Sequence, residues 1–166
     1  MLGGGDAEPD GAHMAEDTAD TLMHPPGEGW APVDDTGFIG HVGPLWQRQD
    51  KDGVPILAFT SDEHHRNSNG VVQGGMLMTL ADRGMGRMAR HEVQGPVATV
   101  SFSYDFMAAA PIGRFIELHP RIAKRTGSLL FMESVLISDG EVLGRAHGVW
   151  KKLRTVPVEG YGNKPI

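Results

Sequence analysis

One segment of the sequence has a strong helical pattern, and it comes just before a long run of strand-like segments. From Gly75 to Arg90, large and small apolar residues recur at helical spacing on one broad face, namely Met76, Leu77, Leu80, Ala81, Met85 and Met88. A helix of this length spans roughly 24 Å, which is enough to cross a small sheet. The chain therefore needs a sheet against which this face is buried.

The segments after Pro96 predict four strands joined by short connections: 97–106, 114–124, 128–138 and 141–153. In the first, Ala98, Val100, Phe102, Tyr104 and Phe106 alternate with a polar set that begins at Thr99. Pro120 indicates a bulge or an edge position in the second strand. The third strand is apolar on both faces, so we expect it to be central and covered on both sides.

Asp139-Gly140 is the best hairpin signal in the chain, and it joins the last two predicted strands. Ahead of the helix, residues 38–46 predict a helical turn or an irregular entry, 54–60 a strand and 61–70 a polar loop. One long helix against one antiparallel sheet is an α+β architecture.

The charge of the chain is concentrated at its start. The net charge is -6, but residues 1–30 hold seven acidic residues and no Lys or Arg, so 15 basic and 14 acidic residues remain in 31–166. We expect 1–30 to be a disordered acidic tail, 31–155 a single domain and 156–166 a C-terminal tail. A nearly neutral domain without a basic stripe does not favour nucleic-acid binding.

Cysteine is absent, which excludes disulfides, thiolate nucleophiles and cysteine metal sites and agrees with a cytoplasmic location. No apolar run approaches the roughly 18 residues of a membrane span, and we expect no signal peptide. The run Asp62-Glu63-His64-His65 holds metal-ligand residue types, but adjacent side chains diverge, so we expect neither a metal site nor a cofactor.

The predicted helix begins at Gln73-Gly74-Gly75. Glycines allow another molecule to approach the backbone closely, and the first N–H groups of a helix lack partners and carry partial positive charge. Such donors suit a developing oxyanion. Alternatively, the two glycines only form the turn from loop to helix.

Asp82 lies eight residues past Gly74, among the small helical neighbours Gly75, Thr79 and Gly86. A carboxylate on a face without bulk can take a proton from water or attack a carbonyl. The alternative is a surface acid close to Arg83 or Arg87. Asn67 in the polar loop and Thr99 on the strand after the helix are, taken alone, an ordinary turn residue and an ordinary strand residue.

The spacing of Asn67, Gly70, Gln73, Gly74, Gly75, Ala81 and Asp82 resembles that of the hotdog-fold acyl-CoA thioesterases, in particular the phenylacetyl-CoA thioesterase-like (PaaI-like) branch. The resemblance covers about 54–153. It implies a long central helix wrapped by an antiparallel sheet of about five to six strands, hydrolysis of an acyl- or aryl-CoA thioester, and a homodimer that pairs further into a homotetramer.

The resemblance also implies roles for single residues. Asp82 matches the general base or nucleophile, the Gly74 amide the oxyanion donor, Asn67 the residue that holds the thioester or the attacking water, and Thr99 the one that orients this water. In such proteins the site forms between two subunits, so the resemblance implies that Asp82 faces the partner's Asn67 and Gly74.

Gln73 departs from the family pattern, in which His commonly precedes the two glycines. Glutamine can donate a hydrogen bond to a carbonyl but cannot carry a proton near pH 7. For the CoA substrate, Lys124, Arg125 and Ser128 at the predicted hairpin suit phosphate groups, and Gly75 suits close approach of the substrate. The hairpin residues are otherwise a solvated basic turn.

Three other functions stay open at this point. A non-catalytic acyl-CoA or lipid-binding hotdog protein is favoured slightly by Gln73 and by the acidic tail. A hotdog dehydratase or hydratase requires a catalytic His near the pocket, where Gln73 stands. A plain interaction domain requires that no thioester binds.

Overall fold

The computed structural model describes residue 25 and residues 27–154. The two predicted tails fall almost wholly outside this range, and the domain limits at 31 and 155 stay a prediction. Trp30, at the end of the predicted N-terminal tail, packs edge-on against Phe115 with ring centroids 5.1 Å apart. The guanidinium carbon of Arg48 lies 4.7 Å from the centre of the Trp30 ring. The packed part of the chain therefore includes Trp30.

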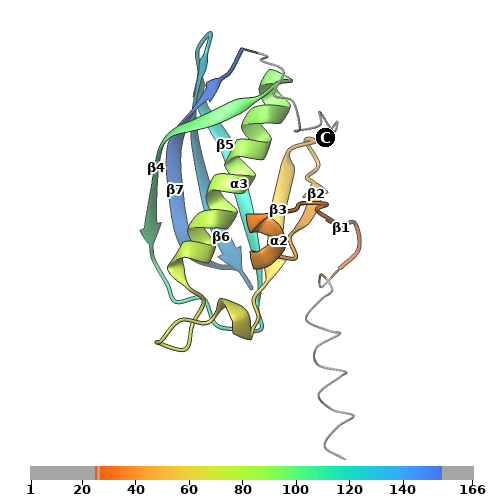
Figure 1. Cartoon of the computed structure of the whole chain (residues 1–166), viewed down its shortest axis with the longest axis vertical. Helices are drawn as coiled ribbons and strands as arrows, with labels where there is room; N and C mark the ends of the chain where they lie inside the picture. The colour runs from red at the N-terminus through yellow and green to blue at the C-terminus, as the bar shows by residue number, and fades with distance from the viewer. Residues whose placement is uncertain (1–24, 26, 155–166) are drawn as a thin grey trace, which may run out of the picture.

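The described residues form one sheet and one long helix, with two shorter helical segments. The strands are β1 (Ala31–Pro32), β2 (Trp46–Gln49), β3 (Pro55–Thr60), β4 (Val97–Phe106), β5 (Phe115–Arg125), β6 (Leu129–Ser138) and β7 (Glu141–Lys152), and the helical segments are α2 (Phe38–Val42), η1 (Glu63–His65) and α3 (Gly74–Val93). All strand pairs are antiparallel, in the order β1-β2-β3-β5-β6-β7-β4. The sheet curves around α3, which lies across one of its faces (Figure 1).

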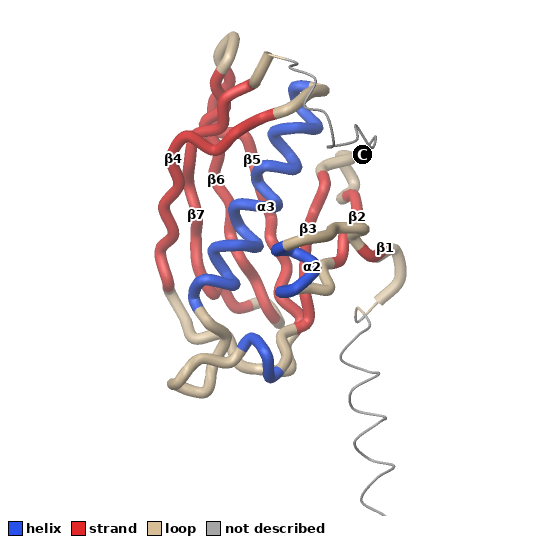
Figure 2. The backbone as a smooth tube through the Cα atoms, in the orientation of Figure 1, coloured by secondary structure: helices blue, strands red, loops and turns tan. Residues whose placement is uncertain are grey.

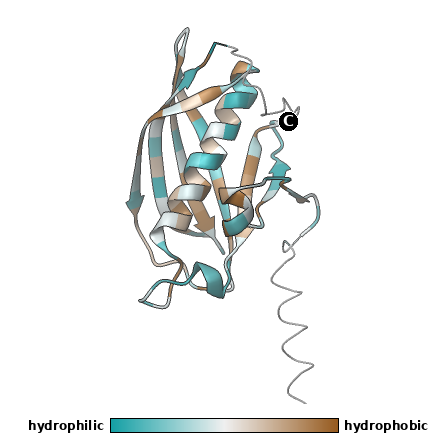
Figure 3. Cartoon of the chain, viewed as in Figure 1, coloured by the Kyte–Doolittle hydropathy of each residue, from teal (hydrophilic) through white to brown (hydrophobic). Residues whose placement is uncertain are grey.

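The predicted helix is confirmed, although it starts one residue earlier and ends three residues later than expected. Its buried side chains face the sheet, and the strands beneath carry alternating hydrophobic and hydrophilic bands (Figure 3). The helix backbone comes so near β5 that a Cβ on Gly84 would lie 2.1 Å from Cδ2 of Leu118. Gln94 ends the helix in a left-handed conformation (φ 48°).

The four strands predicted after the helix are present within one residue of their expected limits. Asp139 and Gly140 both have positive φ, 48° and 81°, as a tight hairpin turn requires. We expected the strand 128–138 to be covered on both faces, but in a single chain it is covered on only one. β6 is central, but α3 covers only one face, and Phe131 on the other is 38% exposed.

Strand β4 lies at the edge of the sheet beside β7, although it precedes β5 in sequence. Its pairing register shifts between Thr99 and Ser101, so Val100 has no partner and is 60% exposed. This bulge corrects the predicted strict alternation. Thr99 pairs with Trp150 and shares the helix-facing side with Phe102, whereas an unbroken alternation places these two residues on opposite faces.

Pro120 lies beyond the last pair between β5 and β3, which joins Leu118 to Leu57, and faces only Ser134 of β6. The proline therefore stands where one side of β5 has become an edge, two residues before the register shift at Ile122. The sequence did not predict β1 and β2, whose residues carry no apolar alternation.

The irregular segments 61–73 and 107–114 meet at the N-terminal end of α3 (Figure 2). Backbone hydrogen bonds hold them together, among them Val72 N–H to Ala110 O (2.9 Å) and Ser61 N–H to Arg114 O (2.8 Å). No helix in residues 27–154 is both long and apolar enough to cross a membrane.

Candidate active site

Asp82 lies on the side of α3 that faces β4. The Thr99 hydroxyl donates a 2.8 Å hydrogen bond to Oδ1 of Asp82. Asp82 is half-buried and Thr99 exposed, so the pair stands at the rim of the helix–sheet interface rather than within the core. The bond occupies one carboxylate oxygen and leaves Oδ2 available.

The arginines next to Asp82 on the helix have other partners. Arg83 forms an ion pair with Asp35, and Arg87 donates a hydrogen bond to Gln47. Within residues 27–154 no ion pair joins either arginine to Asp82. The alternative that Asp82 is simply an arginine-paired surface acid does not describe its surroundings.

The small residues around Asp82 differ in what surrounds them. Gly75 faces open space, since a Cβ there would meet only Cγ of Gln73 at 3.9 Å. Thr79 donates its hydroxyl back to the Gly75 carbonyl at 2.8 Å. Gly86, in contrast, accommodates the buried Trp150, whose Nε1 would lie 3.3 Å from a Cβ. Only the part of this face toward the helix N-terminus is open.

The start of α3 offers free backbone donors. Gln73 is the N-cap, with an exposed side chain that makes no capping hydrogen bond, while its own N–H donates to His65 O at 2.7 Å. In the described residues no backbone acceptor outside the helix takes the N–H of Gly74 or Gly75. These amides combine unpaired hydrogens with the positive end of the helix dipole.

A side chain of this same chain makes the close approach at Gly74. A Cβ on Gly74 would lie 2.9 Å from both Cε1 and Cζ of Phe106, so any larger residue would collide with the ring. The glycine therefore has an internal packing role in addition to the role expected for it from the sequence. Phe106 was not among the predicted site residues, because on β4 it reads as one more apolar strand residue.

Asn67 has a fixed orientation in the loop before the helix. Its Oδ1 accepts the backbone N–H groups of Asn69 (2.8 Å) and Val71 (3.3 Å). Because backbone donors require an oxygen at that place, the Asn67 amide presents its NH₂ group elsewhere. Gly70, with φ +81°, completes this tight loop.

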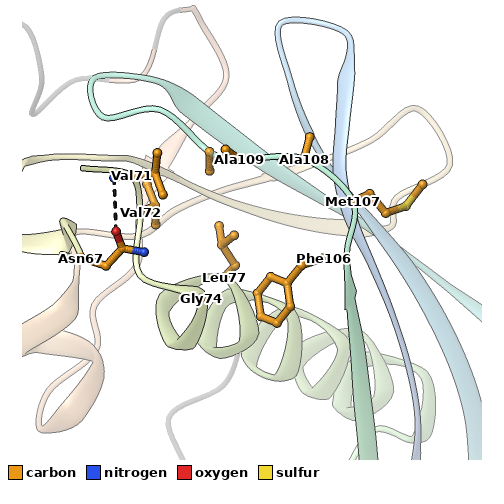
Figure 4. A pocket seen from close by; sticks show the side chains of 10 residues that line it. Asn67, Val71, Val72, Gly74, Leu77, Phe106, Met107, Ala108 and Ala109 are labelled. Atoms are coloured by element: carbon orange, nitrogen blue, oxygen red, sulfur yellow. Dashed lines mark hydrogen bonds between the residues drawn. The ribbon is translucent and has the colours of Figure 1, made fainter. Parts of the chain in front are cut away.

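Asn67, Gly74 and Phe106 line one hollow of about 360 Å³ at the end of the helix. Its other walls are apolar: Val71, Val72, Leu77, Met107, Ala108, Ala109 and Ala110. Asn67 and Phe106 stand on either side of Leu77 and Gly74 (Figure 4). The hollow thus joins one amide donor side chain and one free backbone amide to an apolar cavity.

Asp82 is absent from this hollow, and the helix explains why. Eight residues separate Gly74 from Asp82, which at 1.5 Å per residue is about 12 Å along a rigid axis. A single carbonyl carbon cannot contact both groups of one chain.

The basic hairpin residues divide into two groups. Arg125 forms an ion pair with Glu92 of α3, whereas Lys124 is exposed and has no ion pair within residues 27–154. Ser128 lines a hollow of about 800 Å³ together with Gly127, Lys151, Lys152, Leu153 and Arg154. No carboxylate lines this hollow, and no described ion pair neutralises its three cations.

Lys152 stands on the same face of the sheet as Thr99. It pairs with Val97 and alternates with Trp150, the partner of Thr99. The basic hollow therefore begins two residues along the strand from the Asp82–Thr99 pair. Lys151, Lys152 and Arg154 were not predicted, although the β6–β7 hairpin pairs Lys151 with Leu129 and so brings them beside the β5–β6 hairpin.

The run from Asp62 to His65 has a structural role. The carboxylate of Asp62 accepts the N–H of Glu63, and His65 Nδ1 accepts the N–H of Asp62 at 2.9 Å, which together cap η1. His65 is 4% exposed and contacts the Val42 carbonyl through Nε2 at 2.7 Å. Within the described residues no three His, Asp or Glu side chains are grouped so that they could hold a metal ion.

Sequence comparison identifies the family. "Putative esterase PA0474" of Pseudomonas aeruginosa is 34% identical over 132 residues, which cover 78% of this chain and 98% of that protein. Residues 69–144 match the family model described as "Thioesterase superfamily". The chain belongs to the thioesterase superfamily. It is a thioester hydrolase.

Solved structures show the same fold as this thioesterase. The PaaI protein of E. coli, from the phenylacetic acid degradation operon, has a TM-score of 0.64 at 13% identity and covers 86% of this chain and 96% of its own. Smu.793 of Streptococcus mutans, bound to acetyl CoA, has a TM-score of 0.56 at 14% identity and covers 59% and 79%. The predicted PaaI-like hotdog fold is confirmed, with seven strands instead of five or six.

His65 gives the thioesterase a pH-dependent stability. Burial lowers the pKa of His65 below its ordinary value of 6.5, because the neutral ring is both desolvated and used as an acceptor at Nδ1. A lowered pKa means that the unfolded chain binds the proton more tightly. The stabilisation is therefore complete above pH 6.5 and is lost as the pH falls below it.

We expect an NMR titration to give His65 a pKa below 6.5, with its resonance identified by its loss in His65→Gln. We also expect a smaller free energy of unfolding in urea at pH 5.5 than at pH 7.5, and a smaller pH dependence in the variant. A His65 pKa at or above the ordinary value would contradict this account.

Proposed function

We propose that this thioesterase hydrolyses acyl-CoA thioesters, including aryl-CoA, to the free acid and CoA. The observation that carries the proposal is that a single helix bears both halves of a hydrolytic site. Free amides at Gly74 suit a developing oxyanion, and a half-buried Asp82 without an arginine partner suits a base.

The reaction begins when water attacks the thioester carbonyl carbon and Asp82 takes its proton. The carbonyl oxygen becomes an oxyanion that accepts the Gly74 N–H. When the tetrahedral intermediate collapses, the carbon–sulfur bond breaks, and the CoA thiolate receives the proton from Asp82. Direct attack by Asp82, with an anhydride that water then hydrolyses, uses the same atoms and stays open.

Neighbouring side chains position these groups. The Thr99 hydroxyl bonds Oδ1 of Asp82 and so directs Oδ2 to the water. Because backbone N–H groups occupy Oδ1 of Asn67, its NH₂ is the part that donates to the thioester. Gln73, exposed at the N-cap, supplies a neutral donor where the family commonly has His, and Gly75 leaves room for the substrate.

Two copies of the chain complete the site. Asp82 lies beside Thr99 near one end of edge strand β4, and Gly74 lies beside Phe106 at the other end. Suppose that the β4 edges of two chains pair antiparallel, centred between Phe102 and Ser103. Thr99 of each chain then lies opposite Phe106 of the other, and this brings the Asp82 of each chain close to the Gly74 of the other. The 12 Å separation within one chain (from about 1.5 Å per residue) supports such an arrangement. We propose a homodimer on this ground, with a dimer of dimers as the further assembly.

The basic residues at the other end of the helix would bind the CoA phosphates. Lys124 and Ser128 keep the role predicted for them, while Arg125 is partly neutralised by Glu92. Lys151, Lys152 and Arg154 join them, since they line the acid-free hollow that begins beside Thr99. The structural neighbour bound to acetyl CoA supports a CoA ligand for this fold.

Asp82→Asn tests the mechanism. The amide keeps the shape and the Thr99 contact but cannot accept a proton, so we expect kcat to fall by about a hundredfold or more, within the usual range for a lost general base. The measurement is thiol release from acetyl-, hexanoyl- and phenylacetyl-CoA, at unchanged oligomeric state. Asp52→Asn, an exposed acid in the turn before β3, is the matched control. Near-parental turnover in Asp82→Asn would remove this residue from the mechanism.

Mixed dimers test the shared site. Asp82→Asn and Asn67→Ala are each expected to be nearly inactive as homodimers. Co-refolded in equal amounts, they form heterodimers in which one site has both native residues, so roughly a quarter of the parental activity returns. Activity no greater than the mean of the two variants would indicate that each site lies within one chain.

A substrate without the nucleotide phosphates tests whether the basic hollow lined by Lys152 and Arg154 binds these phosphates. We expect Lys152→Ala and Arg154→Ala to raise KM for acyl-CoA roughly tenfold, the loss of one hydrogen bond to a charged group of about 1.5 kcal/mol. KM for the acyl-pantetheine, which lacks the nucleotide phosphates, should not change. Lys51→Ala, in the exposed turn before β3, serves as the control. An equal effect on both substrates would contradict phosphate binding.

A further inference from the structure

The Phe106 ring lies directly against the backbone of Gly74. Two of its carbons would be 2.9 Å from a Cβ at that position, so an additional carbon atom between ring and helix would require the ring to shift. Gly74 is also the residue whose amide the proposed function assigns to the thioester oxygen. The carbons next to the reacting carbonyl must therefore pass close to this ring.

The position of the ring is supported from behind. Tyr104, two residues earlier on β4, packs against Phe106 with ring centroids 4.6 Å apart and ring planes tilted by 54°. The Tyr104 hydroxyl is buried against Gly144 and lacks a hydrogen-bond partner in the described residues, and burial raises the pKa of Tyr104 to about 12. Phe106 thus rests between the half-buried Tyr104 ring and the helix, although it is itself 57% exposed.

Beyond the ring, the hollow continues between apolar walls. Leu77, Val72 and Met107 line it, and no charged side chain does. An acyl chain that has passed Phe106 meets mainly hydrophobic surface there, and Asn67 is the one polar side chain that lines the hollow. Such a cavity favours apolar chains, and it discriminates between them by shape rather than by polar contacts.

We propose that Phe106 determines which acyl groups the enzyme accepts. The ring narrows the space beside Gly74, so that acyl groups without branches at the carbon next to the carbonyl fit, and groups branched at this carbon are excluded. Phe106 acts by shape alone and takes no part in proton transfer. This inference rests on the proposed function, because it assumes that the thioester carbonyl binds at Gly74.

The first experiment compares kcat/KM for butyryl-CoA and pivaloyl-CoA in the parent protein, Phe106→Leu and Phe106→Ala. We expect the parent to prefer the unbranched substrate, and Phe106→Ala to reduce that preference about tenfold or more, the scale of steric selection in apolar pockets. Phe106→Leu should be intermediate. Phe131→Ala, the same truncation on the far face of the sheet, is the matched control.

A binding experiment separates this inference from catalysis. The CoA thioethers made from bromoacetone and bromopinacolone keep a carbonyl group but cannot be hydrolysed, and calorimetry gives their affinities. We expect the preference for the acetone-derived thioether over the pinacolone-derived one to be largest in the parent, intermediate in Phe106→Leu and smallest in Phe106→Ala. Thermal melting checks that each variant is folded.

The outcomes are distinct. A changed affinity ratio in Phe106→Ala supports the role of Phe106 even if no variant releases thiol, which would be a failure of the hydrolytic proposal alone. Thiol release by the parent with unchanged ratios in both Phe106 variants overturns the role of Phe106 alone. If neither thioether binds to the parent protein, both proposals fall.

Discussion

The rigid spacing along α3 is the constraint on which the remaining structure depends. A helix buried on a curved sheet cannot bend to bring its first turn to its third, so Gly74 and Asp82 stay about 12 Å apart at 1.5 Å per residue. The contact between Gly84 and Leu118 holds the helix backbone against β5 and fixes its height above the sheet. Under the proposed function, this rigidity prevents one chain from completing a site, and two antiparallel copies would form two identical ones.

The sequence predicts the local parts of this molecule well. Helical periodicity locates α3, strand periodicity locates β4 through β7, and the spacing from Asn67 to Asp82 identifies the residues now found on and before the helix. Local periodicity does not predict which distant segments pair with each other. The edge position of β4 and the bulge at Val100 both depend on which strands meet. Phe106 was missed for the same reason.

The loop before the helix shows how function and stability share residues. His65 caps η1, holds Val42 and accepts the Gln73 N–H on its carbonyl, so it connects three segments around the helix start. The Asn67 loop follows directly, with its own backbone donors satisfied by the side-chain oxygen. The run from Asp62 to His65, whose residue types resemble those of a metal site, thus supports the loop that orients the Asn67 NH₂ group.

The bulge at Val100 links the chemistry to the assembly of the sheet. An extra residue in β4 lets Thr99 and Phe102 lie on one face, so the acid receives its hydroxyl partner while the strand still covers the core. A strand closed without that insertion would either turn Thr99 toward solvent or withdraw Phe102 from the interior. The register of β4 and the Asp82–Thr99 hydrogen bond therefore depend on the same inserted residue.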